Sequence, residues 1–154
     1  MEALSVYIVR IHPLNEYIGS FKVDAGADAL PIQGTVIAAP PGSPGGHGDE
    51  ILFQYNATLD DEARLDDNVY YIPPDLVYKV GEKMLNDWVF FEQEYYTFDN
   101  AREGRVVASN HKLYKPGVRI VCARGLSHRL IPQMFSTSDL YAVKSAYVVC
   151  YIVS

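Results

Sequence analysis

A loop rich in proline and glycine, residues 39–50, restricts the fold of this chain more than any other segment. It reads APPGSPGGHGDE and holds three prolines and four glycines. Proline has no backbone N–H to donate and glycine is entropically costly to order, so the segment cannot continue a helix or a strand ladder. It contains no basic residue and lacks the Gly-Lys-Ser/Thr ending of a phosphate-binding loop. We therefore predict a projecting loop rather than a nucleotide site.

Short β-prone runs lie on both sides of this loop. Each is rich in valine, isoleucine or tyrosine and is bounded by turn-forming residues, which is typical of strands. The runs are 4–11, 16–24, 32–38, 51–55, 69–72, 105–108, 118–123 and 141–153. The sequence shows no evident internal repeat and no domain linker. A chain of 154 residues that is 49% hydrophobic can bury a core. We predict a mainly β (α+β) single domain spanning 1–154, built as an antiparallel sandwich or barrel.

Two short helices are expected within this domain, at about 58–65 and 74–86. Thr58 followed by Asp61 resembles a capping arrangement, and acidic residues suit the first turn of a helix. After Pro74, apolar residues recur at intervals of three and four, which is helical spacing. They are Val77, Val80, Met84, Trp88, Phe91 and Tyr95.

The segment 88–98, WVFFEQEYYTF, fits two periodicities. Its aromatic and β-branched residues have strong β propensity, and one long helix would leave several of them exposed. We favour a break at Asn86-Asp87 followed by a strand from about 88 to 98, with a continuous helix to residue 96 as the alternative. On the strand, alternate side chains share a face. We predict three of them as interface aromatics: Trp88, Phe90 and Tyr96.

Charge is separated along the chain. Residues 49–67 carry a formal charge of −6 and residues 102–130 carry +6, within a net charge of −6. We predict an acidic patch of Asp60, Asp61, Glu62, Asp66 and Asp67. We also predict a basic patch of Arg102, Arg105, Lys112, Lys115, Arg119, Arg124 and Arg129. Such asymmetry can steer a partner or a second copy of the chain. The alternative is that the segments neutralise each other within one fold or are simply solvated.

The chemistry of a cofactor or metal site is not indicated. The four histidines are isolated, and neither a Cys-x-x-Cys nor a paired-histidine spacing occurs, so we expect no metal and no cofactor. Glu92 and Glu94, or His128, are the residues that a small hydrolase would use, which is the weakest alternative. Cys122 and Cys150 both lie in apolar runs. We expect two buried thiols, with a disulfide between strands as the alternative.

These features predict a non-enzymatic assembly or interaction module that binds copies of itself or a larger assembly. A virion component of capsid, decoration or connector type is one concrete form. The alternative is an inhibitor or binding protein whose acidic patch meets a basic macromolecular surface. Nucleic acid binding by the basic patch is not favoured, because its known motifs are absent. No long apolar run and no secretion signal are evident, so we expect a cytoplasmic or virion location.

Overall fold

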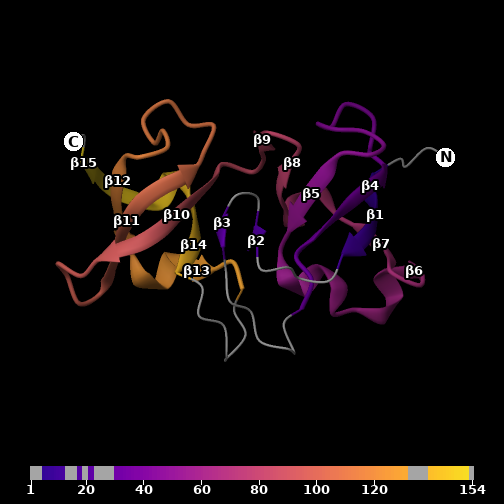
Figure 1. The fold of residues 1–154 in the computed structure, drawn as a ribbon, viewed down its shortest axis with the longest axis horizontal. Helices are drawn as coiled ribbons and strands as arrows, with labels where there is room; N and C mark the ends of the chain where they lie inside the picture. The colour runs from indigo at the N-terminus through magenta and orange to yellow at the C-terminus, as the bar shows by residue number, and fades with distance from the viewer. Residues whose placement is uncertain (1–4, 13–16, 19–20, 23–29, 132–138, 153–154) are drawn as a thin grey trace. The chain divides into compact units, whose positions relative to one another are not determined.

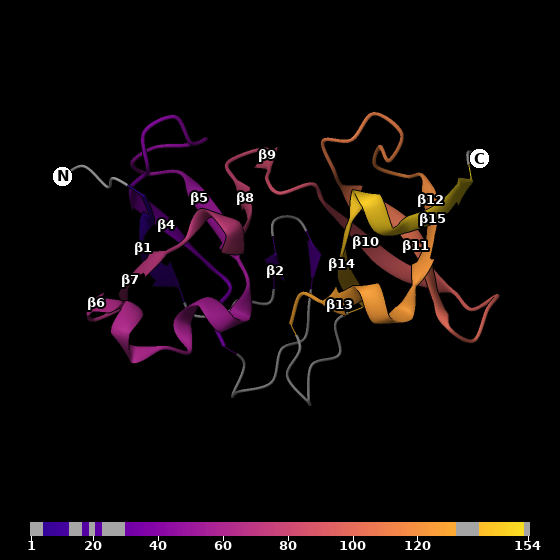
Figure 2. The same cartoon turned by 180° about the vertical axis from the view of Figure 1, so that it is seen from behind.

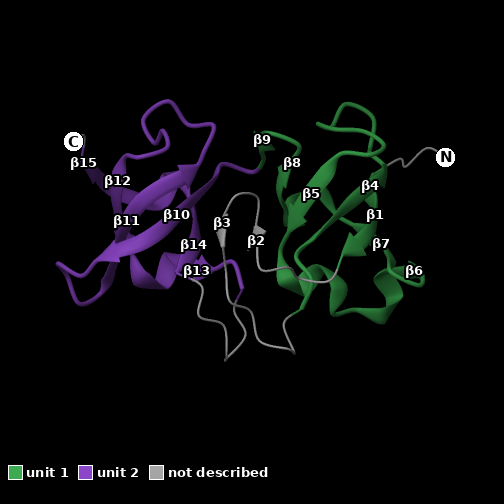
Figure 3. Cartoon of the chain, in the orientation of Figure 1, with its two compact units in different colours: residues 1–85, 133–137 green, residues 86–132, 138–154 purple. Residues whose placement is uncertain are grey.

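The computed structural model describes residues 5–12, 17–18, 21–22, 30–131 and 139–152. The chain divides into two compact units, which Figure 3 colours separately. Unit 1 comprises residues 1–85 with 133–137, and unit 2 comprises residues 86–132 with 138–154. Both are built from antiparallel strands joined by turns and short 3₁₀ segments. The predicted mainly β, antiparallel fold is therefore confirmed, whereas a single domain spanning the chain stays a prediction. Each unit is described by itself.

Unit 1 contains a seven-stranded sheet in the order β6-β7-β1-β4-β5-β8-β9 (Figure 1). Its strands are β1 (Tyr7–His12), β4 (Gln33–Ala38), β5 (Glu50–Phe53), β6 (Arg64–Asp66), β7 (Val69–Ile72), β8 (Val77–Val80) and β9 (Lys83–Met84). Its 3₁₀ segments are η1 (Tyr55–Thr58), η2 (Asp61–Ala63) and η3 (Pro74–Leu76). Two further short strands, β2 (Tyr17–Ile18) and β3 (Phe21–Lys22), pair with each other, and the rest of the predicted strand at 16–24 lies outside the described residues.

Unit 2 contains a six-stranded sheet in the order β13-β14-β10-β11-β12-β15. Its strands are β10 (Trp88–Tyr95), β11 (Ala101–Ala108), β12 (Arg119–Ala123), β13 (Ser127–Arg129), β14 (Leu140–Lys144) and β15 (Val148–Ile152). Its 3₁₀ segments are η4 (Arg124–Leu126) and η5 (Ser145–Tyr147). Figure 2 shows η5 as the short coil that leads into β15.

The two units repeat one topology. Strands β1, β4, β5, β6, β7 and β8 of unit 1 occupy the same places in chain order and in sheet order as β10, β11, β12, β13, β14 and β15 of unit 2. A 3₁₀ segment precedes β6 and β13, and another separates β7 from β8 and β14 from β15. The expectation that the chain has no internal repeat was therefore wrong. Among the described residues, unit 1 has in addition β2 and β3, the 3₁₀ segment η1, and β9, which pairs with β8.

The strand registers of the two units also correspond. Val9 of β1 lies opposite Val36, and Phe91 of β10 lies opposite Val106. In both strand pairs the register shifts directly before this residue, between Ile8 and Val9 in β1 and between Phe90 and Phe91 in β10. A second shift also recurs, between Leu52 and Phe53 in the β5–β8 pair and between Val121 and Cys122 in the β12–β15 pair. A bulge of this kind bends a strand at a defined position. Two bulges shared at equivalent positions show that the correspondence extends to single residues.

A glycine occupies an equivalent place in each sheet. Gly34 lies opposite Ile11, and Gly104 lies opposite Gln93. A Cβ atom added to Gly34 would lie 2.5 Å from the backbone oxygen of Arg10. One added to Gly104 would overlap the backbone oxygen of Glu92 and lie 2.7 Å from its carbonyl carbon. Both strands thus need glycine because the neighbouring backbone approaches closely.

The turns that follow are matched as well. Gly48 has φ of 93° and Gly117 has φ of 94°, a conformation that favours glycine. The Gly48 amide donates to the carbonyl of Val36, and the Gly117 amide donates to that of Val106, both at 2.8 Å. The repeat is visible in the sequence only as GTVIA at 34–38 and GRVVA at 104–108.

Both sheets must curl. Four strand spacings separate β7 from β8 in the sheet of unit 1, which is about 19 Å if the sheet were flat. Only η3 connects these strands, and the chain from Ile72 to Val77 spans about 12 Å in that conformation. The edges of the sheet are therefore brought toward each other. The same argument holds for β14, η5 and β15 in unit 2.

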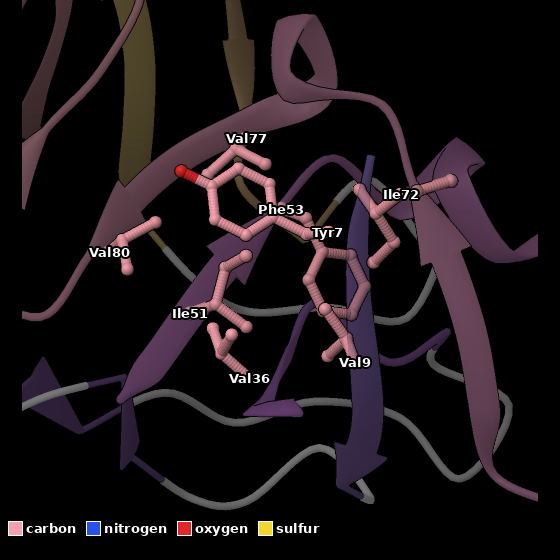
Figure 4. Close-up of a cluster of buried hydrophobic side chains, with 9 residues drawn as sticks. Tyr7, Val9, Val36, Ile51, Phe53, Ile72, Val77 and Val80 are labelled. Atoms are coloured by element: carbon pink, nitrogen blue, oxygen red, sulfur yellow. The ribbon is translucent and has the colours of Figure 1, made fainter. Parts of the chain in front are cut away.

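Each curled sheet encloses its own core. The core of unit 1 contains one apolar cluster contributed by most of its strands, shown in Figure 4: Tyr7, Val9, Val36, Ile51, Phe53, Ala57, Ile72, Val77 and Val80. The corresponding cluster of unit 2 is Val89, Phe91, Val106, Tyr114, Ile120, Cys122, Tyr141 and Val143. Burial of these side chains at about 25 cal/mol per Å² of apolar area is the main stabilising contribution in each unit.

The two predicted helices are wrong. Residues 58–65 form the end of η1, then η2 and the start of β6, and residues 74–86 form η3 followed by β8 and β9. The acidic 58–65 segment buries only Ala63 within η2, so little apolar burial would stabilise a helix there. In 74–86, Val77 and Val80 lie on one face because the register skips a residue between them. The bulge thereby gives the buried residues Val77 and Val80 the three-residue spacing that one face of a helix would show.

The predicted break at Asn86-Asp87 is confirmed. Both residues have positive φ, 56° and 60°, which asparagine and aspartate tolerate better than most residues. Strand β10 begins directly after them and ends at Tyr95, so the predicted strand at 88–98 is confirmed and is three residues shorter than expected. The continuous-helix alternative is excluded.

The proline- and glycine-rich segment forms no regular element between β4 and β5. The Tyr7 hydroxyl donates to the carbonyl of Pro44 at 2.7 Å, and a ring nitrogen of His47 lies 3.0 Å from the carbonyl of Ile37. The loop is therefore fastened to unit 1 at two points. Across the described parts of the chain, no helix is long and apolar enough to cross a membrane.

Candidate functional site

The predicted acidic residues gather at one end of the unit 1 sheet, on η2 and β6 and around them. All five are exposed: Asp60, Asp61, Glu62, Asp66 and Asp67. The Asp60 carboxylate caps η2 by accepting from the Glu62 amide at 2.9 Å. Arg64 forms an ion pair with Asp67, and the two line a shallow hollow together with Asp61, Leu65 and Asp66. Exposed charges of this kind contribute little to stability and leave a surface that repels anions.

Four of the seven predicted basic residues have partners within unit 2, and the predicted patch stays a prediction. Arg105 pairs with Glu94 at 3.2 Å, and Arg119 pairs with Glu103 at 2.9 Å. Arg102 lies 4.2 Å above the ring of Tyr141. Arg129 donates to the hydroxyl of that same tyrosine at 3.2 Å. Three basic residues are solvent-exposed, in the loop before β12 and on η4: Lys112, Lys115 and Arg124.

The ion pair between Glu103 and Arg119 is structural. Glu103 is 2% exposed, and its second oxygen accepts from the Thr97 amide at 2.8 Å. Burial alone raises the pKa of Glu103, but the hydrogen bonds from Arg119 and Thr97 outweigh it and lower the pKa from its ordinary 4.5. Arg119 also lies 3.8 Å from the ring centre of Tyr95. The cluster fixes the β10–β11 turn.

The three predicted interface aromatics are placed differently. Trp88 and Phe90 are buried, whereas Tyr96 is 77% exposed on the turn between β10 and β11. The Trp88 ring meets the His128 ring edge-on at 5.1 Å, and the Lys144 ammonium lies 4.7 Å above it. Trp88 therefore works as a packing residue, and of the three only Tyr96 is presented to solvent.

Of the two sites in the hydrolase alternative, the first consists of Glu92 and Glu94, which both lie on β10, and the second centres on His128, which lies on β13. Glu94 is engaged by Arg105. The pKa of Glu92 is raised by burial and by the charges of Glu94 and Asp139, while burial lowers the pKa of His128. Glu92 is on β10 and His128 on β13, which are separated by β14 in the sheet. Among the described residues no cluster of histidine, cysteine and carboxylate side chains could hold a metal ion.

The two cysteines have different environments. Cys122 is buried, as expected, and burial raises the pKa of its thiol. Cys150 is exposed, so the expectation that both are buried was wrong, and both thiols are free. The error arose because β15 is apolar and yet lies at the edge of its sheet.

The surface feature that sequence analysis missed is β15 itself. The predicted long strand at 141–153 is divided by η5 into a buried β14 and an exposed β15. Apolar side chains at its start and along it are exposed: Tyr147 by 47%, Val149 by 71%, Tyr151 by 40% and Ile152 by 44%. No local sequence signal distinguishes this edge strand from a buried one. The chain matches no model of a known protein family, no curated protein and no solved structure.

Proposed function

We propose that this protein is a non-enzymatic assembly module that associates with protein chains through unit 2. The observation that carries the proposal is the exposed apolar surface of that unit. Tyr96 and Phe98 lie exposed on the β10–β11 turn, and further apolar side chains lie along 147–152. Grouped apolar side chains in contact with water mark interaction sites in soluble proteins, and tyrosine is enriched in such sites.

The charged residues support a binding role over catalysis. Two ion pairs hold neighbouring strands of unit 2 together: Glu103 with Arg119, and Glu94 with Arg105. A catalytic acid or base must instead face a substrate within hydrogen-bonding distance. An assembly module needs stable strands and an exposed surface, and unit 2 has both.

Light scattering with a mass readout tests the proposal on the full chain over a range of concentrations. We expect a mass above that of one chain, and we expect it to persist as salt rises from about 0.1 M to about 1 M, because apolar contacts are not screened. A chain that stays monomeric at high concentration would refute self-association. A mass that falls to one chain at high salt would assign the contact to the charged surfaces instead.

The alternative function, binding to a basic macromolecular surface, is favoured by one observation. The five acidic residues of the predicted patch lie exposed on neighbouring elements of unit 1. Polylysine binding, measured with the chain and with a variant in which Asp60, Asp61, Asp66 and Asp67 are changed to asparagine, tests this. Equal binding by both would refute it. A virion subunit is one form of the assembly proposal, and the size of the assembled particle tests it.

A further inference from the structure

One pair of equivalent residues, on β8 of unit 1 and β15 of unit 2, differs sharply in solvent exposure. In unit 1 the register of β8 skips Tyr78, and in unit 2 the register of β15 skips Val149. Tyr78 is 1% exposed, whereas Val149 is 71% exposed. The Tyr78 carbonyl accepts from the Leu85 amide at 2.8 Å, directly after β9. The outer side of β8 is thus occupied by chain, and in the described residues β15 ends its sheet.

The other ends of the two large sheets are protected against pairing with another strand. Strand β6 has three residues and carries Arg64 and Asp66, β9 has two and carries Lys83, and β13 has three and carries Arg129. Short length and charged side chains are the usual devices that keep edge strands apart. Strand β15 has five residues, VVCYI, with no charge and no proline. It is the end of these sheets that lacks both devices.

We propose that β15 pairs antiparallel, edge to edge, with β15 of a second copy of this chain, an inference that rests on the proposed assembly function. Unit 1 indicates what this position accepts, because β9 pairs antiparallel with β8 there. The second copy offers a matching strand that is extended, uncharged and apolar. A two-fold axis makes the contact self-complementary and closes it as a dimer.

The symmetry fixes what the pairing looks like. In an antiparallel pair related by a two-fold axis perpendicular to the sheet, one residue must lie opposite its own copy. Cys150 is the middle residue of β15 (Val148–Ile152), so pairing along the whole strand places it opposite Cys150 of the second copy. Opposed residues in such a pair have Cα atoms about 4.5–5.5 Å apart, which is within the range that a disulfide bridges.

Oxidative cross-linking of the full chain tests this register. The probe is copper(II) phenanthroline: two thiols become a disulfide with release of two protons, and two copper(II) ions take up the two electrons. We expect a covalent dimer on a non-reducing gel from the wild type and from Cys122→Ser, and none from Cys150→Ser. Leu126→Cys in the Cys150→Ser background is the control for random collision, because Leu126 is also exposed on unit 2. It should form little dimer.

Light scattering of Val149→Lys supplies the second measurement. The substitution places one lysine from each copy next to the two-fold axis, which should weaken dimerisation about 100-fold. Thermal unfolding, measured at a concentration where both chains are monomeric, should be unchanged because Val149 is exposed. Leu59→Lys is the matched control, since Leu59 is 58% exposed on unit 1, and it should dimerise like the wild type.

The results separate this inference from the proposed function. An oligomer that Val149→Lys leaves intact, or a Leu126→Cys chain that cross-links as fast as Cys150, would overturn the β15 pairing and leave the assembly function standing. A wild-type chain that is monomeric at every concentration would overturn both. Loss of the dimer in Val149→Lys alone, together with a Cys150-dependent cross-link, would establish the pairing.

Discussion

Replacing Gly104 by alanine tests the feature of the repeat that leaves the least space, the close approach of the β10 backbone to this glycine. The new Cβ atom would overlap the backbone oxygen of Glu92 and lie 2.7 Å from its carbonyl carbon. These are backbone atoms of the paired strand β10, so they cannot swing aside as a side chain would. The β10–β11 ladder must separate locally, at the centre of the unit 2 sheet.

The size of the effect follows from this overlap. Overpacking by one methyl group costs about 1–3 kcal/mol when side chains can yield, and we expect about 3 kcal/mol or more for Gly104→Ala because backbone must move. In unit 1, the Cβ of Gly34→Ala would meet the Arg10 oxygen at 2.5 Å and a Val9 methyl group at 2.6 Å. That contact is less severe, so we expect about 2 kcal/mol.

Each unit contains a matched control. An added Cβ at Gly125 in unit 2 or at Gly46 in unit 1 would meet nothing within 4 Å, and neither residue requires positive φ. Alanine there should change stability by less than about 1 kcal/mol, with a sign that favours the folded state, because it restricts the unfolded chain.

Urea denaturation of the full chain measures these differences, and hydrogen exchange assigns each one to a unit. Protection should fall in β10 and β11 for Gly104→Ala and in β1 and β4 for Gly34→Ala. For units of this size about 1 kcal/mol shifts the melting temperature by about 4–8 °C, so the effect of Gly104→Ala is also visible thermally. If Gly104→Ala and Gly125→Ala were equally stable, the close approach of β10 to β11, and with it the matched geometry of the two units, would be refuted.

Three further predictions concern polar groups. Glu103→Gln should destabilise unit 2 by about 3 kcal/mol because it leaves its arginine partner uncompensated, whereas Glu94→Gln should cost less than about 1 kcal/mol; equal losses in urea denaturation would contradict this. Tyr7→Phe should cost about 1 kcal/mol through loss of the hydrogen bond to Pro44 and should increase amide exchange in the 39–50 loop, and unchanged exchange would argue against the tether. His128 has a pKa below its ordinary 6.5, so as pH falls the unfolded state binds the proton first. Unit 2 should therefore lose stability as pH falls below about 6.5. A His128→Gln chain should lack this dependence of unfolding free energy on pH, and an unchanged dependence would assign it to other groups.

The strands and loops were predictable from the sequence because they depend on local chemistry. Valine, isoleucine and aromatic residues between proline and glycine clusters indicated β1, β4, β5, β7 and β12, and the asparagine–aspartate pair indicated the break before β10. These signals act within a few residues. The antiparallel, mainly β architecture follows from them.

The helix prediction at 74–86 failed for a reason that lies outside local chemistry. A bulge in β8 shifts the alternation of side chains, so that Val77 and Val80 share a face at a spacing of three. A bulge is defined by its partner strand, and the partner β5 lies more than twenty residues earlier in the sequence. A single sequence cannot distinguish this pattern from a helix.

The candidate site was predicted only in part for a similar reason. Exposure of the acidic patch was predictable because several adjacent aspartates and glutamates cannot all be buried without cationic partners. The sequence did not indicate which of the basic residues have partners within unit 2, because that depends on which strands are neighbours: Glu103 and Arg119 come together through the β11–β12 pair. Edge position, which decides the exposure of β15, is likewise set by strand order.

The repeat gives the asymmetry between the units a physical meaning. One strand path forms both sheets, and the units have two bulges and one closely approached glycine position in common, so similar packing requirements apply to both. One difference lies at the outer side of the equivalent strands β8 and β15. In unit 1 a turn at Gly81, with φ of 57°, returns the chain as β9, and Tyr78 is buried. In unit 2 the same position presents Val149 to solvent. Val149 is not part of the core of unit 2, so its side chain is available to contact a partner. In our proposal, the strand that pairs with β15 comes from a second copy, whereas the strand that pairs with β8 is β9 of the same chain.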